Sequence, residues 1–179
     1  IMSIWGGITG GLLGFVVLGP IGALVGSVIG SNLSSKSKRR RPNNFDQQVA
    51  FFAALFACLA KIAKADGRVD EAEIKKIEEI ISSKLNLNRE HRNFAINIFQ
   101  KAKDDNVSFE AYASNLYQVL SSSPNSLLVF YEMLFELALA DGILHPDEDK
   151  LLKQIPRIFR FDKKVYNSLY EKFVERTND

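Results

Sequence analysis

The sequence reads Ala65-Asp66-Gly67-Arg68-Val69-Asp70-Glu71-Ala72-Glu73, and an altered copy, Ala140-Asp141-Gly142-Ile143-Leu144-His145-Pro146-Asp147-Glu148, follows 75 residues later. In both copies a helical apolar pattern ends at Ala-Asp-Gly, and a second helical pattern carries Glu six positions after the glycine. The flanks also align, Leu59 with Leu134 and Ile62 with Leu137. A match that extends beyond the motif indicates an internal duplication of a helix–turn–helix unit.

The residues after position 44 show helical periodicity and no sustained alternation of the kind typical of strands. We expect seven helices, at about residues 45–65, 70–85, 89–103, 109–120, 125–140, 146–156 and 163–174. Asn88, Ser108 and Asp162 are the expected N-caps of three of them. The sequence therefore predicts an all-α domain of about seven helices with an internal pseudo-two-fold duplication.

The N-terminal segment is apolar and uncharged. Ile4–Ile29 would reach roughly 39 Å as a helix, enough to cross a hydrocarbon core of ~30 Å. Five of the 23 basic residues then fall within 36–41. By the positive-inside rule, this cluster predicts a single-pass anchor with the C-terminal domain in the cytoplasm. Gly19-Pro20 would kink the span, or would form the turn of a re-entrant hairpin.

The predicted division of the chain is a Gly-rich transmembrane anchor at 1–30, a basic juxtamembrane linker at 31–44 and the helical domain at 45–179. Two runs of glycine at four-residue spacing predict that the anchor self-associates into a homodimer, although a merely glycine-rich span is the alternative: Gly6, Gly10, Gly14 and Gly22, Gly26, Gly30. The linker either binds anionic lipid headgroups or serves only to set topology.

The acidic residues of the two turns have local roles as helix caps. Asp70 can cap the helix that follows it, with Glu73 reaching back in a capping box. In the second copy Pro146 suits the first helical position and Glu148 repeats the glutamate of the box, while His145 is a poorer cap than Asp. Capping of this kind needs no ligand.

The alternative role is a divalent metal site. The turns match the second half of a calcium-binding loop, but aliphatic residues or lysine stand where that loop has its first two ligands, which excludes its usual form: Ile62, Lys64, Leu137 and Leu139. A cation shared between the two turns would use carboxylates of both copies, Asp66, Asp70, Asp141 and Asp147. Capping alone and a shared cation both remain open at this point.

Other functional classes find no support in the sequence. Eighteen basic residues face 21 acidic ones outside the 36–41 cluster, so a nucleic-acid partner is not expected. No nucleophile elbow, phosphate loop or metalloprotease motif occurs, so we expect no enzymatic activity. Cys58 lies on an apolar stretch and is expected to be buried. His145-Pro146-Asp147 is the tripeptide of J-domains, but the helix before it has no Lys or Arg, so we interpret the match as coincidental.

With these residues assembled, the region 45–175 resembles the TerB-like (tellurite-resistance protein B) family, on the strength of the paired Ala-Asp-Gly turns. The glycine-rich start, Met2-Ser3-Ile4-Trp5-Gly6-Gly7, followed by a basic stop, is similar to DjlA-type membrane co-chaperones. This resemblance implies a bacterial inner-membrane protein that dimerises through its anchor and, through a C-terminal J-domain, recruits the Hsp70/DnaK system. In TerB proteins a set of acidic residues is proposed to bind metal. The resemblance implies that their counterparts in this chain are Asp66, Asp70, Glu73, Asp141 and Glu148.

The sequence therefore predicts a non-enzymatic, membrane-anchored interaction module that faces the cytoplasm and binds a protein partner. We expect DnaK regulation only where a J-domain follows Asp179. The rival hypothesis is a metal-binding stress protein of the tellurite-resistance type that uses the acidic turns.

Overall fold

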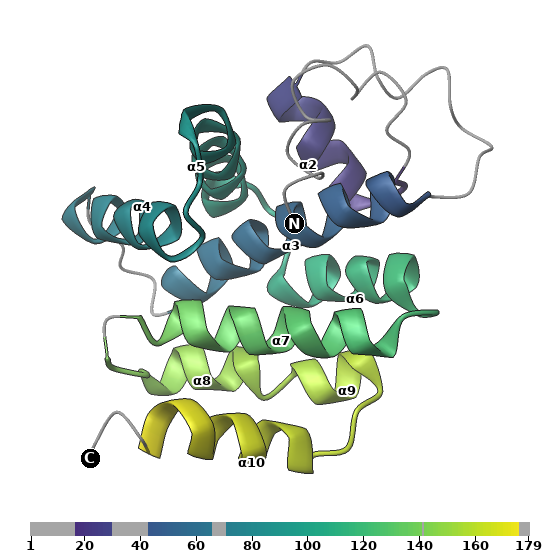
Figure 1. The fold of residues 1–179 in the computed structure, drawn as a ribbon, viewed down its shortest axis with the longest axis vertical. Helices are drawn as coiled ribbons and strands as arrows, with labels where there is room; N and C mark the ends of the chain where they lie inside the picture. The colour runs from purple at the N-terminus through teal and green to yellow at the C-terminus, as the bar shows by residue number, and fades with distance from the viewer. Residues whose placement is uncertain (1–16, 30–42, 66–70, 141, 176–179) are drawn as a thin grey trace.

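The computed structural model describes residues 17–29, 43–65, 71–140 and 142–175, and this part of the chain is all-helical, as predicted (Figure 1). The α-helices are α2 (Pro20–Ile29), α3 (Asn44–Ala63), α4 (Glu71–Lys84), α5 (Arg89–Asp104), α6 (Phe109–Leu120), α7 (Pro124–Ala138), α8 (Pro146–Leu152), α9 (Ile155–Phe159) and α10 (Lys164–Tyr170). A π-helical turn, Glu171–Glu175, continues α10.

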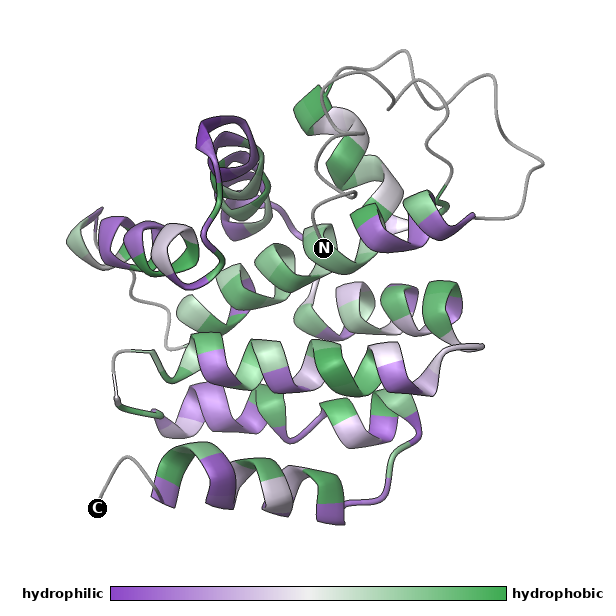
Figure 2. Cartoon of the chain, in the orientation of Figure 1, coloured by the Kyte–Doolittle hydropathy of each residue, from purple (hydrophilic) through white to green (hydrophobic). Residues whose placement is uncertain are grey.

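Helix α3 is the centre of the domain and packs against α2, α5, α6, α7 and α8. Figure 2 shows it as hydrophobic along most of its length, whereas α4 and α5 carry hydrophilic residues on their outer faces. Five of its residues are fully buried alanines, which let neighbouring helices approach closely: Ala50, Ala53, Ala54, Ala57 and Ala60. A helix that is apolar on every side is typical of a buried core helix.

The start of α3 lies slightly earlier than predicted, inside the segment assigned to the linker. Asn43 is its N-cap, and the Asn43 side chain accepts a hydrogen bond from the Asp46 N–H. The Asp46 carboxylate, which is fully buried, accepts one from the Asn43 N–H in return. This reciprocal pair satisfies two backbone donors that a helix N-terminus otherwise leaves unpaired.

The duplicated helix–turn–helix is visible at matching helix ends. Helix α3 ends at Ala63 and α7 at Ala138, and the helices after the turns begin at Glu71 and Pro146, each pair 75 residues apart. The residues after the first helices, Lys64 and Leu139, have nearly the same backbone angles, φ −96° and ψ 5° against φ −97° and ψ 7°. The two copies therefore leave their first helix in the same conformation.

The second halves of the copies differ, and the predicted helix 146–156 is wrong in its extent. Helix α8 ends at Leu152, and a separate helix, α9, begins at Ile155. Pro156 lies in the first turn of α9, where its missing N–H costs nothing, so it starts a helix instead of ending one. Both helices pack on α7: the Tyr131 hydroxyl donates to the Leu152 carbonyl at 2.8 Å, and Phe130 contacts Phe159.

Helix α2 lies within the predicted anchor but packs against α3, α5 and α6. The interruption expected at Gly19-Pro20 is present, because Gly19 has φ +91° and the helix begins at Pro20. Ile21 and Val25 are completely buried against the domain. The rest of the anchor and linker, including Gly6, Gly10, Gly14 and Gly30, lies outside the described residues, so the predicted division of the chain and the self-association stay predictions.

Asn115 of α6 fixes the start of α2. Its side-chain oxygen accepts a hydrogen bond from the Ile21 N–H at 2.8 Å, and its side-chain nitrogen donates to the Leu18 carbonyl at 2.9 Å. The side chain is 6% exposed. A Cβ added at Gly19 would lie 2.9 Å from this amide, so the close approach and the positive φ both require glycine there.

Length and composition alone would allow α3 to cross a membrane, and it is the one described helix that meets this test. However, 72% of the apolar stretch concerned is buried inside the domain. Helix α2 is a shorter apolar helix of 10 residues.

We predict that Asn115→Ala releases α2 from the domain, because the Ile21 N–H and the Leu18 carbonyl both lose their partner. An unpaired buried polar group costs about 1–3 kcal/mol, so amide hydrogen exchange across Ile21–Val25 should accelerate by at least about tenfold. Asn97→Ala, on an exposed position of α5, is the matched control and should leave this exchange unchanged. Equal exchange in the two variants would contradict the assigned role of Asn115.

A cluster around Asp105 joins α3 to the connection between α5 and α6. The Asp105 carboxylate lies 2.6 Å from the Lys61 ammonium and accepts hydrogen bonds from the Val107 N–H and the Tyr112 hydroxyl. The Lys61 ammonium also donates to the Asp105 carbonyl at 3.1 Å. Burial, followed by the hydrogen bond and charge of Asp105, raises the pKa of Tyr112 above its ordinary range. Asp105 therefore fixes the positions of α3, α6 and the connection between α5 and α6 relative to one another.

We predict that Asp105→Ala lowers the free energy of unfolding by about 2–4 kcal/mol in urea titrations. The reason is that the Lys61 ammonium, on a side chain only 12% exposed, loses its carboxylate and keeps only the Asp105 carbonyl, while the Tyr112 hydroxyl loses its partner. The neighbouring Asp104 is 71% exposed and pairs loosely with Lys103 at 3.9 Å, so Asp104→Ala should change stability by less than about 0.5 kcal/mol.

Candidate functional site

The acidic turns are only partly described by the structure. Asp66, Asp70 and Asp141 lie outside the described residues, as does the side chain of Glu73. Of the six candidate metal ligands, Asp147 and Glu148 can be placed. Among the described residues, no three His, Cys, Asp or Glu side chains come together as a metal site. The shared cation accordingly stays a prediction.

The second turn shows the capping role directly. Gly142 has φ +86°, and α8 begins at Pro146 with His145 as its N-cap residue. The Glu148 carboxylate accepts a hydrogen bond from the His145 N–H at 3.2 Å, which confirms the predicted glutamate of the capping box. The Asp147 carboxylate lies 3.7 Å from the Lys150 ammonium, one turn further along the helix. His145-Pro146-Asp147 is therefore a helix start, as predicted.

A groove of about 660 Å³ lies along α3 and α7. One wall is the outer face of the first turns of α3, and the other is the first half of α7. The groove extends from these N-terminal turns to the end of α4, where Lys84, Leu85 and Leu87 close it. Its volume is within the range of protein pockets that bind small molecules or short peptide segments.

The floor of the groove is apolar. Phe51 lies between the two walls, with its ring 5.4 Å from that of Phe130 on α7 in an edge-to-face contact. Val129 and Met133 line the α7 wall, and Val129 is 49% exposed. Apolar side chains that remain exposed in a groove are typical of surfaces that bind a partner.

The rim of the groove is polar but almost uncharged. Asn44 and Gln48 stand on the α3 side, and Asn125 and Ser126 stand on the α7 side. Gln47, also on the α3 side, donates to the Val119 carbonyl at 3.4 Å and so helps hold α3 on the end of α6. Among the described residues that line the groove, Lys84 is the one charged residue, and its ammonium is 3.8 Å from the Glu136 carboxylate.

The sequence did not predict this groove. Val129 and Met133 fit the apolar pattern of their helix, so periodicity assigns them to the core with their neighbours. The sequence nevertheless indicates that some apolar side chains of this helix are exposed. Leu127, Leu128, Val129 and Phe130 are consecutive, and four consecutive residues of a helix cannot all face inward. The structure buries Leu127 and Phe130 and leaves Leu128 and Val129 exposed.

Cys58 is fully buried in α3, as predicted. Burial raises the pKa of its thiol far above its ordinary value of 9.0, so the reactive thiolate does not form at neutral pH.

We predict that Cys58 in the folded protein reacts with an aromatic disulfide reagent more than about a hundredfold slower than after unfolding in urea. The fold favours the neutral thiol, so this contribution to stability is fully present below pH 9.0 and is lost progressively as the pH rises above that value. Unfolding titrations between pH 7 and 10 measure the second effect. Rapid native labelling would contradict the assignment.

An all-helical domain with duplicated Ala-Asp-Gly turns, preceded by a glycine-rich apolar segment, defines the class of membrane-associated helical modules. Comparison with known proteins refines this class. The family model of tellurite resistance protein TerB matches residues 52–170, and that of the co-chaperone DjlA transmembrane domain matches residues 2–40. The chain belongs to the DjlA family of co-chaperones, and its residues 52–170 belong to the TerB family.

The similarity to individual relatives extends over most of this chain. The co-chaperone protein DjlA of Photobacterium profundum is 33% identical over 173 residues, which cover 89% of this chain and 62% of the relative. The Coxiella burnetii protein of the same name is 31% identical over 188 residues, 97% of this chain and 67% of the relative. For the Escherichia coli K12 protein the values are 30% over 156 residues, 84% and 57%. No solved structure matches the chain.

Proposed function

We propose that this chain is the membrane-anchored, non-enzymatic interaction module of a co-chaperone, and that its helical domain binds a protein partner through the groove between α3 and α7. The groove is the observation that carries the proposal. It combines an apolar floor, an exposed Val129 and a neutral polar rim, the composition expected of a protein-binding surface. The buried core beneath the groove includes Leu127 and Phe130 of the same helix but not Val129.

The membrane side of the proposal is supported by the DjlA transmembrane match at residues 2–40 and by the basic cluster at 36–41. Under the positive-inside rule this cluster favours a helical domain in the cytoplasm, at the inner membrane of a bacterium. A homodimer formed through the anchor is part of the proposal. In the described residues, a Cβ added at Gly26 would meet no atom within 4 Å, so the fold itself does not require glycine there.

The partner is proposed to belong to the Hsp70/DnaK chaperone system or to be a protein delivered to it. The relatives are co-chaperones by name, and the chain spans about 62% of the Photobacterium protein and 67% of the Coxiella protein. We therefore propose the activity of a complete co-chaperone as the setting in which the groove binds its partner.

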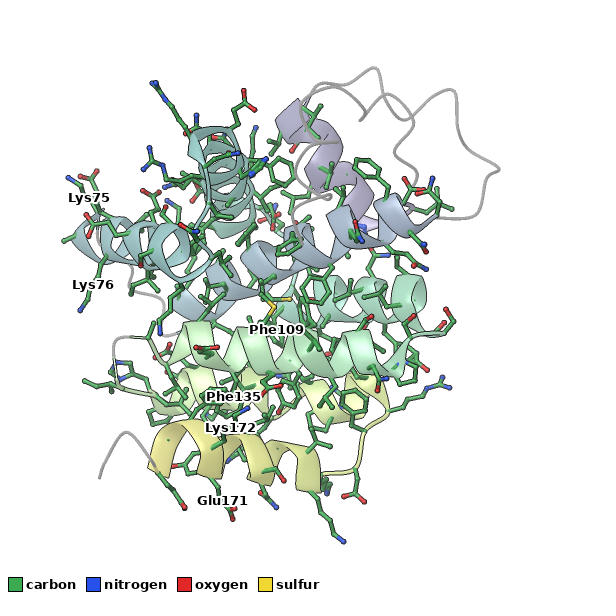
Figure 3. All side chains as sticks on the ribbon, in the orientation of Figure 1. Lys75, Lys76, Phe109, Phe135, Glu171 and Lys172 are labelled. Carbon is green, nitrogen blue, oxygen red and sulfur yellow. The ribbon has the colours of Figure 1, made fainter. Side chains whose placement is uncertain are left out.

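We predict that a photo-crosslinking amino acid at Val129 forms protein adducts in intact bacterial cells, because that side chain stands in the groove and is half exposed. Lys76 points outward from α4 (Figure 3) and does not line the groove, so it is the control position and should form none of these adducts. Mass spectrometry identifies the adducts, and a chaperone or its substrate is the expected result.

The same cells test orientation. A green fluorescent protein fused to the C-terminal end of the chain should be fluorescent, as expected for a cytoplasmic location. A non-fluorescent, correctly inserted fusion would contradict the orientation.

The crosslinking experiment tests the groove. The absence of adducts at Val129, or the same adducts at both positions, would contradict the groove as the partner site.

A further inference from the structure

We propose that the groove binds an extended apolar peptide segment of about four residues, with an acidic residue at the end that lies next to Lys84. This inference rests on the proposed function and deepens it by naming the chemistry of the bound segment. Four features of the groove support it: its length, its free amide groups, its apolar floor and the position of its single cation.

The length of the groove sets the length of the segment. Its α3 wall runs from Asn44 to Phe52 and its α7 wall from Asn125 to Met133, eight residues apart in each case. At about 1.5 Å per residue each wall is about 12 Å long. An extended chain advances about 3.3 Å per residue, so about four residues fill the groove.

The rim favours an extended backbone. The side-chain amides of Asn44, Gln48 and Asn125 have no hydrogen-bond partner among the described residues, and each offers both donors and an acceptor. An extended peptide presents unpaired N–H and C=O groups that such amides can pair. A bound helix satisfies these groups internally, and an acyl chain has none, so neither would use the amides.

The floor selects apolar side chains. Phe51 and Val129 form a surface on which alternate side chains of an extended segment would rest, while the intervening ones point to solvent. Leu85 and Leu87 extend the same surface at the α4 end. Contact with apolar side chains of the segment would remove this surface from water, which favours binding.

The single cation sets the direction of the segment. The Lys84 side chain is 51% exposed, and its contact with Glu136 at 3.8 Å is loose, so its ammonium is accessible to a second carboxylate. No other described residue that lines the groove is charged. A peptide with an acidic residue at this end would therefore gain a favourable contact that its charge-reversed counterpart would lose.

The test uses the full chain in lipid nanodiscs and a fluorescein-labelled eight-residue peptide, with apolar residues at alternate positions and Asp at one end of its apolar stretch. Fluorescence anisotropy measures the dissociation constant. Val129→Asp should weaken binding by at least about tenfold, the scale of a buried interface contact. Leu128→Asp is the matched control: Leu128 is 39% exposed on the same helix but does not line the groove, so binding should change by less than about twofold.

Two further comparisons test the backbone and charge contacts separately. A peptide with N-methylated amides should bind less tightly than the parent, and Gln48→Ala should reduce that difference. Lys84→Glu should weaken the Asp peptide and improve a Lys-ended version, whereas Lys76→Glu, on the same helix but outside the groove, should affect neither. Circular dichroism spectra matching the parent protein establish that each variant is folded.

Equal affinities of the Val129→Asp and Leu128→Asp variants would overturn the inference. So would a groove that binds a fluorescent fatty acid, lost in Val129→Asp, but no peptide. These outcomes are distinguishable from failure of the proposed function. Protein adducts at Val129 without peptide binding leave the partner site in place and remove only the extended-peptide inference, whereas the absence of both removes the partner site itself.

Discussion

The fold depends on the burial of α3 along most of its length. Because this helix has apolar or small side chains on every face, it is stable only when other helices surround it, and α2, α5, α6, α7 and α8 do so. Its alanines bring these helices close, and the cluster of Lys61, Asp105 and Tyr112 fixes where α3 meets the turn between α5 and α6. The polar contacts therefore set the register of an arrangement that apolar burial drives.

Much of this arrangement could be predicted from local sequence signals. The N-caps Asn88 and Ser108 accept their expected backbone hydrogen bonds, and the Ala-Asp-Gly repeat correctly indicated where α3 and α7 end. The features that could not be predicted depend on contacts between residues distant in sequence. The hydrogen bond between Asn115 and Ile21 of α2 joins residues 94 positions apart, and the groove is lined by residues of four separate segments. Pro156 could equally end one helix or begin the next, and packing of Phe159 on Phe130 accompanies the second outcome.

The duplication also accounts for the location of the groove. Its two walls belong to α3 and α7, the first helix of each copy, and the helices meet where Phe51 contacts Phe130. In the first copy this helix is enclosed along most of its length, and only its first turns line the groove. In the second copy the equivalent helix packs on α3 and is contacted by α8, α9 and α10, and these neighbours leave Val129 49% exposed. Divergence of the two copies thus leaves an apolar surface that the core does not use.

The attachment of α2 has a mechanical consequence. Force that enters the domain through Val17 is transmitted by the two hydrogen bonds of Asn115 and by the buried side chains of Ile21 and Val25. It therefore reaches all three helices that α2 packs against, α3, α5 and α6. Because these contacts bear the force together, they resist separation of α2 from the domain together. A single connecting segment of chain would transmit only a pulling force. Movement of α2 is consequently coupled to the orientation of the whole helical domain, and with it to the direction in which the groove opens.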